Sequence, residues 1–253
     1  MSPIFAEFLG TLVLVFLGTS VVSNVTLPGT HGQKQGSPYL LITTGWAWAV
    51  FCGVALAAPY SGAHLNPAVS LGLTLAGRFD AQLLTGYVVA QMGGAISGAL
   101  LTYIFYVMHI RLADNETTIR ACFCNAPALP SVMNNLMSEV LATAVLVGVV
   151  LFLTGPELHI AGQTTQVVGL GSVGALPVAL LVWAIGLSLG GTTGYAINPA
   201  RDLGPRIVYV MLRRKKAKAD WSYAWIPVVG PLFGAAIVGL IYHFGMVTTN
   251  ILP

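Results

Sequence analysis

Long apolar segments alternate with short polar ones along the whole chain. A helix that crosses about 30 Å of hydrocarbon needs roughly 20 consecutive, mainly apolar residues. Six segments meet this requirement, and each is predicted to span a membrane. They run from Ile4 to Val22, Tyr39 to Ala58, Ala81 to Met108, Val132 to Leu153, Ser172 to Leu189, and Trp225 to Met246. The pattern therefore predicts an all-α membrane protein.

Composition agrees with lipid as the main solvent. Only 8% of the 253 residues are charged and 56% are hydrophobic, whereas soluble domains carry about 25% charged residues. The first span starts without a basic region, so we expect it to be retained and not cleaved as a secretory signal. Cys52, Cys122 and Cys124 are too few and too badly placed for a disulfide framework or a usual zinc site. We expect no metal ion.

The chain contains two copies of one motif. GAHLNPAVSL, from Gly62 to Leu71, matches GYAINPARDL, from Gly194 to Leu203. The motif asparagines lie 132 residues apart, at positions 66 and 198. Two glutamates in the first and fourth spans, at positions 7 and 139, have the same separation. Two independent landmarks with one offset predict an internal duplication.

The duplication predicts how the halves are arranged. We expect a single channel domain, residues 1–253, whose repeats cover approximately residues 1–110 and 132–253, joined by the loop 111–131. Each repeat contains three spans, so the second repeat must enter the membrane from the opposite side, as inverted repeats of transport proteins do. The two Asn-Pro-Ala motifs then start from opposite faces of the bilayer and can meet in its middle.

Each motif also predicts the start of a short helix. The motif residues are Asn66, Pro67 and Ala68 in the first half and Asn198, Pro199 and Ala200 in the second. Asparagine is a favoured N-cap, and proline suits the first helical position. A helix of about ten residues covers only ~15 Å, half of the hydrocarbon thickness. Two such helix starts at the midplane would direct partial positive charges at one place and repel cations.

The residues before each motif are predicted to line a wet passage. Unwound backbone is tolerated at membrane depth only where it is buried in protein or faces a water-filled cavity. The candidate pore-lining carbonyls belong to Gly62, Ala63, His64, Gly194, Tyr195 and Ala196. Each motif asparagine could accept the capping bond through its oxygen while its NH2 group donates to a passing hydroxyl.

In both of its Asn-Pro-Ala motifs and their flanking residues, the sequence resembles the aquaporin (major intrinsic protein) superfamily. SGAHLNPAV and GYAINPARDLGPR carry the likeness, which extends over essentially the whole chain and favours the glycerol facilitator, or aquaglyceroporin, branch. The resemblance implies six transmembrane helices plus two re-entrant half-helices, and a homotetramer with one pore per subunit. It also implies a cell-membrane location with both termini cytoplasmic, and no cofactor.

The resemblance further implies a selectivity filter on the outer side of the motifs. Position by position, this filter maps onto Trp46, Gly186, Tyr195 and Arg201. Water-selective members have histidine in place of Gly186, so glycine would leave space for a bulkier solute. Asp202 also matches the glycerol branch. The alternatives are an interfacial role for Trp46, a packing role for Tyr195, and a favourable charge in the first helical turn for Asp202.

Buried polar groups near the motifs are expected to support them. In the family, the glutamates that match Glu7 and Glu139 hold the re-entrant loops by accepting backbone N–H bonds, and the same is expected here. Asp202 is placed in this supporting set. His64 is read as a loop-fixing or pore-lining group and not as a metal ligand, and nothing in the sequence supports a pH gate there.

The predicted function is passive conduction of glycerol, other small uncharged solutes and water, with exclusion of ions and protons. The chain is not expected to be an enzyme, because no nucleophile and base are arranged as a pair. A water-selective channel and a secondary transporter are the nearer alternatives, although no set of carboxylates marks a coupling-ion site. The sequence does not rank glycerol against dihydroxyacetone, urea, ammonia or lactic acid.

Orientation is the point at which two expectations disagree. Cytoplasmic N- and C-termini would place Arg78 inside. Most other cations, namely Lys34, Arg111, Arg120, Arg206 and the cluster within residues 213–218, would lie outside. The positive-inside rule expects the reverse. The cluster supplies most of the net charge of +3, and it is interpreted as a solvated loop with no nucleic-acid partner.

Overall fold

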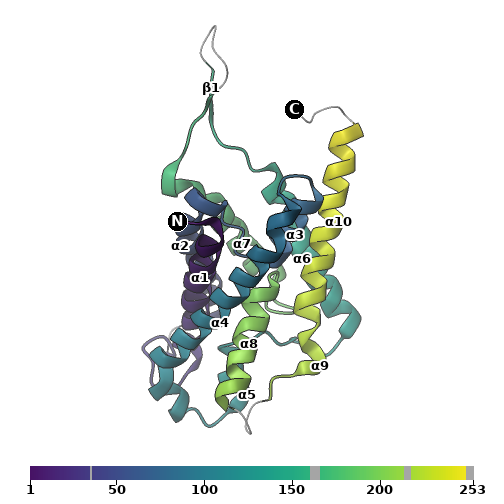
Figure 1. Cartoon of the computed structure of the whole chain (residues 1–253). Coiled ribbons are helices and arrows are strands. Elements are labelled where there is room, and N and C mark those ends of the chain that lie inside the picture. Colours follow the sequence, from purple (N-terminus) through teal and green to yellow (C-terminus); the bar gives the residue numbers. More distant parts are fainter. Residues whose placement is uncertain (35, 160–165, 214–217, 249–253) are drawn as a thin grey trace.

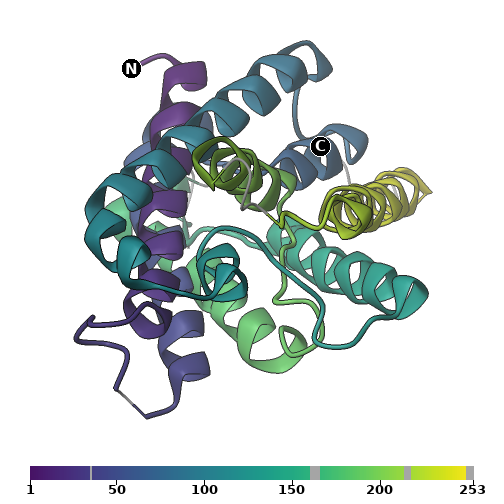
Figure 2. The same cartoon turned by 90° about the horizontal axis from the view of Figure 1, so that it is seen from below.

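The long helices of the structure, a computed structural model, cross from one end of the molecule to the other (Figure 1). Residues 1–34, 36–159, 166–213 and 218–248 are described. The long helices are α1 (Pro3–Thr26), α2 (Pro38–Ser61), α4 (Ala81–Leu112), α6 (Val132–Phe152) and α10 (Ile226–Thr248). A sixth long segment is formed by the 3-10 turn η1 (Gly171–Ala175) and the helix α7 (Leu176–Leu189) that continues it. Viewed end-on, they form one bundle (Figure 2).

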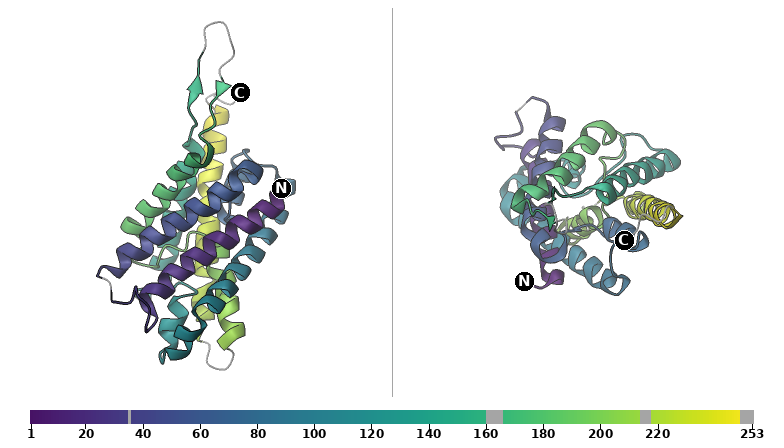
Figure 3. Two further views of the ribbon diagram at one scale, coloured as in Figure 1. Left: turned by 90° about the vertical axis from the view of Figure 1, so that its left-hand side faces the viewer. Right: turned by 90° about the horizontal axis from the view of Figure 1, so that it is seen from above.

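Shorter elements complete the bundle. They are α3 (Pro67–Leu75), α5 (Glu116–Ala121), α8 (Pro199–Arg213), α9 (Trp221–Ala224), the 3-10 turn η1 (Gly171–Ala175), and the strands β1 (Glu157–Leu158) and β2 (Gln166–Val167). The strands form a two-residue antiparallel hairpin that projects from the end where the N-terminus lies (Figure 3). Neither this hairpin nor α5 was predicted. Both lie in loops between the spans, and both are too short to give a periodic pattern of apolar residues.

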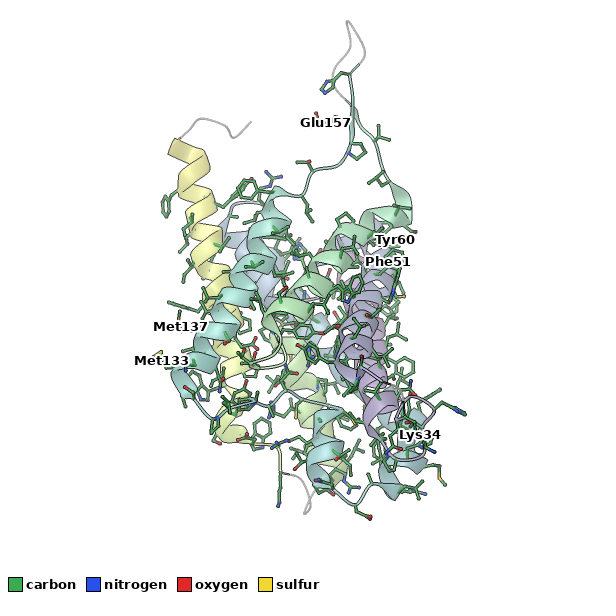
Figure 4. The ribbon with its side chains drawn as sticks, turned by 180° about the vertical axis from the view of Figure 1, so that it is seen from behind. Lys34, Phe51, Tyr60, Met133, Met137 and Glu157 are labelled. Atoms are coloured by element: carbon green, nitrogen blue, oxygen red, sulfur yellow. The ribbon has the colours of Figure 1, made fainter. Side chains whose placement is uncertain are left out.

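Six helical segments are long and apolar enough to cross a membrane. They are Pro3–Thr26, Pro38–Ser61, Ala81–Leu112, Val132–Phe152, Gly171–Leu189 and Trp221–Gly245. The six predicted spans and the all-α fold are therefore confirmed. Large apolar side chains such as Met133 and Met137 point outwards from α6 and remain 66% and 44% exposed (Figure 4), as a surface facing lipid requires.

The short helices α3 and α8 run towards opposite ends of the bundle. Both start near its middle, and α3 runs towards the end that holds the two termini while α8 runs away from it (Figure 1). Each packs against the other half of the chain, α3 against α10 and α8 against α4. The two halves are thereby joined through their short helices.

Glycines permit close contact between the long helices of each half. A Cβ at Gly94 in α4 would lie 2.3 Å from the carbonyl oxygen of Phe8 in α1. A Cβ at Gly234 in α10 would lie 2.2 Å from the carbonyl oxygen of Val140 in α6. Both distances are shorter than non-bonded carbon and oxygen atoms approach each other, so both positions require glycine. Small residues give apolar helices this close packing where no hydrophobic driving force separates them from lipid.

At the end of the bundle opposite the two chain termini, ion pairs neutralise some of the basic side chains. Arg206, which the sequence analysis counted among the outer cations, is fully buried within α8, and its guanidinium lies 2.9 Å from the Asp202 carboxylate. Arg213 pairs with Glu116. The excess of free positive charge at this end is therefore smaller than the sequence suggests. Residues 214–217 of the predicted basic cluster lie outside the described residues.

Candidate pore and selectivity filter

Both Asn-Pro-Ala motifs begin helices in the predicted way. The Asn66 side-chain oxygen accepts from the Ala68 N–H at 2.8 Å and caps α3. The Asn198 oxygen accepts from the N–H groups of Ala200 and Arg201 at 3.1 and 3.3 Å and caps α8. Proline follows each asparagine at the first helical position, where no N–H is needed.

The two motifs contact each other in the interior. The Asn66 Nδ2 donates to the Ile197 carbonyl at 2.8 Å, and the Asn198 Nδ2 donates to the Leu65 carbonyl at 2.9 Å. Each amide therefore caps its own helix and also holds the opposite loop. This reciprocal pair of bonds holds the N-termini of α3 and α8, with their partial positive charges, close together.

The loops before the motifs have an unusual backbone. Gly62 and Gly194 have φ of 79° and 76°, and four non-glycine residues also have positive φ: Ala63 at 52°, Leu65 at 51°, Tyr195 at 41° and Ile197 at 44°. Left-handed conformations cost energy for residues with a Cβ and persist only where their surroundings impose them. The same positions are left-handed in both loops.

Two buried glutamates impose this conformation. The Glu7 carboxylate accepts from the backbone N–H groups of His64 and Leu65 at 2.9 and 2.7 Å. The Glu139 carboxylate accepts from those of Ala196 and Ile197 at 3.0 and 2.8 Å. These bonds satisfy buried N–H groups of both loops on the protein side, while loop residues 62–65 and 195–197 also line the central cavity.

Side-chain donors also hydrogen-bond to each of these two carboxylates. Glu7 accepts from Ser61 Oγ at 2.7 Å and Gln91 Nε2 at 2.8 Å, while Glu139 accepts from Thr193 Oγ1 at 2.6 Å. These partners were not identified from the sequence. Ser61 and Thr193 could have been, because the offset of 132 residues that relates the motifs also relates these two hydroxyls.

His64 is held within an aromatic cluster. Its Nδ1 lies 3.0 Å from Ser70 Oγ, and its ring packs 4.5 and 5.0 Å from the rings of Phe79 and Tyr87, measured between centroids. The Ser70 hydroxyl also accepts from Gln91. His64 thus fixes the loop through its side chain, while it also lies among the residues that line the cavity.

Two cavities meet at the predicted filter. A central cavity of about 230 Å³ contains both motif asparagines and the loop residues 62–65 and 195–197 in its wall. A second cavity, the vestibule, has a volume of about 270 Å³ and is lined by parts of α1, α2 and the segment 117–126. Trp46, Tyr195 and Arg201 line both cavities. Three of the four predicted filter residues therefore lie where one cavity ends and the other begins.

Trp46 and Arg201 stack on each other at this boundary. The guanidinium carbon of Arg201 lies 4.0 Å from the Trp46 ring centroid, a cation–π distance. Both side chains are more than nine-tenths buried. The Trp46 Nε1 has no hydrogen-bond partner among the described residues. An aromatic ring and a cationic donor thus lie together at the boundary, next to a buried indole N–H.

Gly186, the fourth predicted filter residue, lies behind the Tyr195 ring. A Cβ at Gly186 would approach Tyr195 Cζ to 2.8 Å and its Oη to 3.0 Å. The Gly186 carbonyl accepts from Tyr39 Oη at 2.8 Å. The space left by the missing side chain is occupied by tyrosine, so glycine affects the filter by letting the ring move away from the cavities.

The segment 122–131 supplies a residue that the sequence did not indicate. Asn125 Oδ1 accepts from Arg201 Nη1, and Asn125 Nδ2 donates to the carbonyls of Thr193 and Gly194 at 3.0 and 2.8 Å. Asp202, predicted to be structural, accepts from the Asn125 backbone N–H at 2.7 Å. No local pattern marks Asn125, because all of these partners lie far away in the sequence.

The described part of the chain contains no group of three or more His, Cys, Asp or Glu side chains arranged to hold a metal ion. Cys122 and Cys124 are free and buried. Burial raises the pKa of the Cys124 thiol to about 12, which keeps it protonated and unreactive.

Comparisons with known proteins place this architecture. Residues 1–242 match the model of the family described as major intrinsic protein. The chain is 44% identical over 243 residues to the glycerol uptake facilitator protein of Streptococcus pneumoniae strain R6, covering 96% of this chain and 98% of the relative. It is 43% identical over 239 residues to glycerol uptake facilitator protein 3 of Lactiplantibacillus plantarum, covering 94% of each.

A solved structure agrees over nearly the same length. The aquaglyceroporin of Plasmodium falciparum superposes with a TM-score of 0.81 at 30% identity, covering 99% of this chain and 98% of that one. These proteins are channels and facilitators, so the prediction that the chain is not an enzyme is confirmed. The chain is a multi-pass membrane protein that belongs to the major intrinsic protein family.

Proposed function

We propose that this protein is a passive channel that conducts glycerol, other small uncharged solutes and water, and excludes ions and protons. The observation that carries the proposal is the boundary formed by Trp46, Tyr195 and Arg201 between two cavities, with Asn66 and Asn198 in the wall of the central one. Support for glycerol comes from relatives named glycerol uptake facilitator proteins.

The chemistry of the boundary suits a polyol. Glycerol has one edge of carbon atoms and one of hydroxyls. The rings of Trp46 and Tyr195 offer an apolar corner for the carbon edge, while the Arg201 guanidinium can donate to the hydroxyls. Loop carbonyls other than those of Leu65, Gly194 and Ile197, which already accept protein hydrogen bonds, would accept hydrogen bonds from the solute hydroxyls along the central cavity and replace the hydration that the solute loses.

The charges of the site oppose cations. Arg201 contributes a full positive charge, and the N-termini of α3 and α8 contribute partial ones. These charges lie in a buried environment, where screening by water and salt is weak. A cation, including a hydrated proton, would therefore meet a barrier that an uncharged solute does not meet.

The direct test is light scattering from proteoliposomes that are mixed rapidly with hyperosmotic glycerol. We expect brief shrinkage followed by fast re-swelling, because glycerol enters behind the water. Shrinkage without fast re-swelling would identify a water-selective channel and contradict the glycerol proposal. Saturable uptake that depends on an ion gradient would identify a secondary transporter and contradict passive conduction.

Assembly and orientation are also proposed. We infer a single channel domain of two inverted repeats, residues 1–110 and 132–253, assembled as a homotetramer in the cell membrane with both termini cytoplasmic. Crosslinking in native membranes should give a ladder that ends at four subunits. A C-terminal tag should resist protease in right-side-out vesicles, and digestion of the tag in sealed vesicles would contradict the orientation.

A further inference from the structure

Asn125 connects the vestibule to the filter arginine through its side chain. Its Oδ1 accepts a hydrogen bond from Arg201 Nη1. Its Nδ2 donates to the carbonyls of Thr193 and Gly194 at 3.0 and 2.8 Å, directly before the left-handed residue Tyr195. One amide thus contacts both the cation of the filter and the loop that carries the filter tyrosine.

The backbone of Asn125 is fixed just as firmly. Its N–H donates to Asp202 Oδ1 at 2.7 Å, and its carbonyl accepts from Arg206 Nη2 at 2.9 Å. Asp202 and Arg206 are fully buried and paired with each other. Asn125 therefore cannot shift without disturbing a buried ion pair, and breaking such a pair is costly. The amide is held in place before Arg201 contacts it.

The neutral charge of this amide matters as much as its position. Arginine side chains have many rotamers, and a fixed acceptor removes much of that freedom. A carboxylate would hold the guanidinium at least as strongly but would cancel its charge. Among the described residues, Arg201 forms no ion pair. An amide acceptor orients the arginine without adding a negative charge in contact with it.

We propose that Asn125 is a specificity-determining positioning residue. Its Oδ1 sets the orientation of Arg201 against Trp46 and thereby the width of the filter. Its neutrality preserves the positive field that excludes cations. The inference rests on the proposed conduction of glycerol, and it predicts that width and field can be altered separately at this one position.

Two substitutions separate the two roles. Asn125→Ala removes the acceptor and keeps the Arg201 charge, so the guanidinium can move and the filter should admit larger polyols. Asn125→Asp keeps an acceptor for Arg201 and adds a negative charge, but it loses the Nδ2 bonds to the Thr193 and Gly194 carbonyls. Glu139 still holds this loop through the Ala196 and Ile197 N–H groups, so size selection should persist while the cation barrier weakens. Asn134→Asp is the charge-matched control, because Asn134 is an exposed residue near the start of α6.

Proteoliposomes containing each full-length protein would be compared for glycerol, erythritol and proton permeability, the last under a potassium-valinomycin potential. In Asn125→Ala the glycerol-to-erythritol ratio should fall by about tenfold, the discrimination that one carbon unit gives in a fitted site, with no new proton leak. In Asn125→Asp the ratio should stay within about twofold of wild type while the proton leak rises by about tenfold, because the added charge offsets that of Arg201. The control should match wild type in both.

Several results would overturn the inference. Asn125 would be only structural if both variants lost all permeabilities together or failed to fold. The same conclusion would follow if both variants kept the wild-type glycerol-to-erythritol ratio and the wild-type proton leak. If Asn125→Ala alone fails to fold, the leak of Asn125→Asp decides. A wild-type protein that does not pass glycerol would overturn the proposed function as well, whereas a conducting wild type with unseparated variants overturns this inference alone.

Discussion

At the scale of single residues, one missing Cβ determines where the Tyr195 ring lies. Alanine at position 186 would place a carbon 2.8 Å from Tyr195 Cζ, closer than carbon atoms approach. The ring must then move towards the cavities that it lines. We expect Gly186→Ala to lower glycerol permeability by about tenfold, measured by re-swelling of proteoliposomes.

A second substitution, at Tyr195, should restore the glycerol permeability that Gly186→Ala loses. Adding Tyr195→Ala to Gly186→Ala should restore permeability, whereas Tyr195→Phe should not, because the clashing Cζ remains. Gly148→Ala is the matched control, since a Cβ there would lie 3.6 Å from Val238, an ordinary contact. Full permeability in Gly186→Ala alone would show that the Tyr195 ring does not limit the passage.

The two loop-supporting glutamates give a second residue-scale prediction. Replacing either by alanine leaves buried N–H groups without acceptors, at a cost of about 2 kcal/mol or more. Glu7 accepts from Gln91 in addition to a hydroxyl and two backbone groups, whereas Glu139 accepts from a hydroxyl and two backbone groups. Glu7→Ala should therefore lower the melting temperature in detergent more than Glu139→Ala. The reverse order would contradict the ranking.

At the scale of elements, α8 is anchored by the buried pair between Asp202 and Arg206. Asp202→Ala leaves the Arg206 guanidinium buried without its counter-charge, which should destabilise the protein by about 3 kcal/mol or more. Glu116→Ala disrupts the more exposed pair with Arg213 and should cost less than about 1 kcal/mol. Thermal unfolding followed by size-exclusion chromatography would compare them, and equal losses would contradict the role of burial.

Most elements could be predicted from the sequence because their causes are local. Apolar runs set the six spans to within a few residues, and Asn followed by Pro marked the starts of α3 and α8. Asn125 and α5 could not be predicted, since Asn125 acts on carbonyls some seventy residues away in sequence. The position of Gly186 behind Tyr195 also depends on how α7 packs in three dimensions.

At the scale of the whole molecule, the two halves build one interior together. Each short helix packs against the opposite half, and each motif asparagine holds the opposite loop. The central cavity accordingly takes its wall from both halves. The central cavity and the vestibule share Trp46, Tyr195 and Arg201, so a solute that passes between them must pass these side chains.

Blocking that route tests the central claim most directly. Val182 on α7 is buried and lines the central cavity, so Val182→Trp would fill part of its 230 Å³ with a large ring. Val145→Trp on α6 adds the same ring at a position that is 43% exposed on the outer surface. Re-swelling in glycerol should fall to the level of empty liposomes for Val182→Trp and stay at the wild-type rate for Val145→Trp. Wild-type glycerol flux through folded Val182→Trp protein would contradict the account.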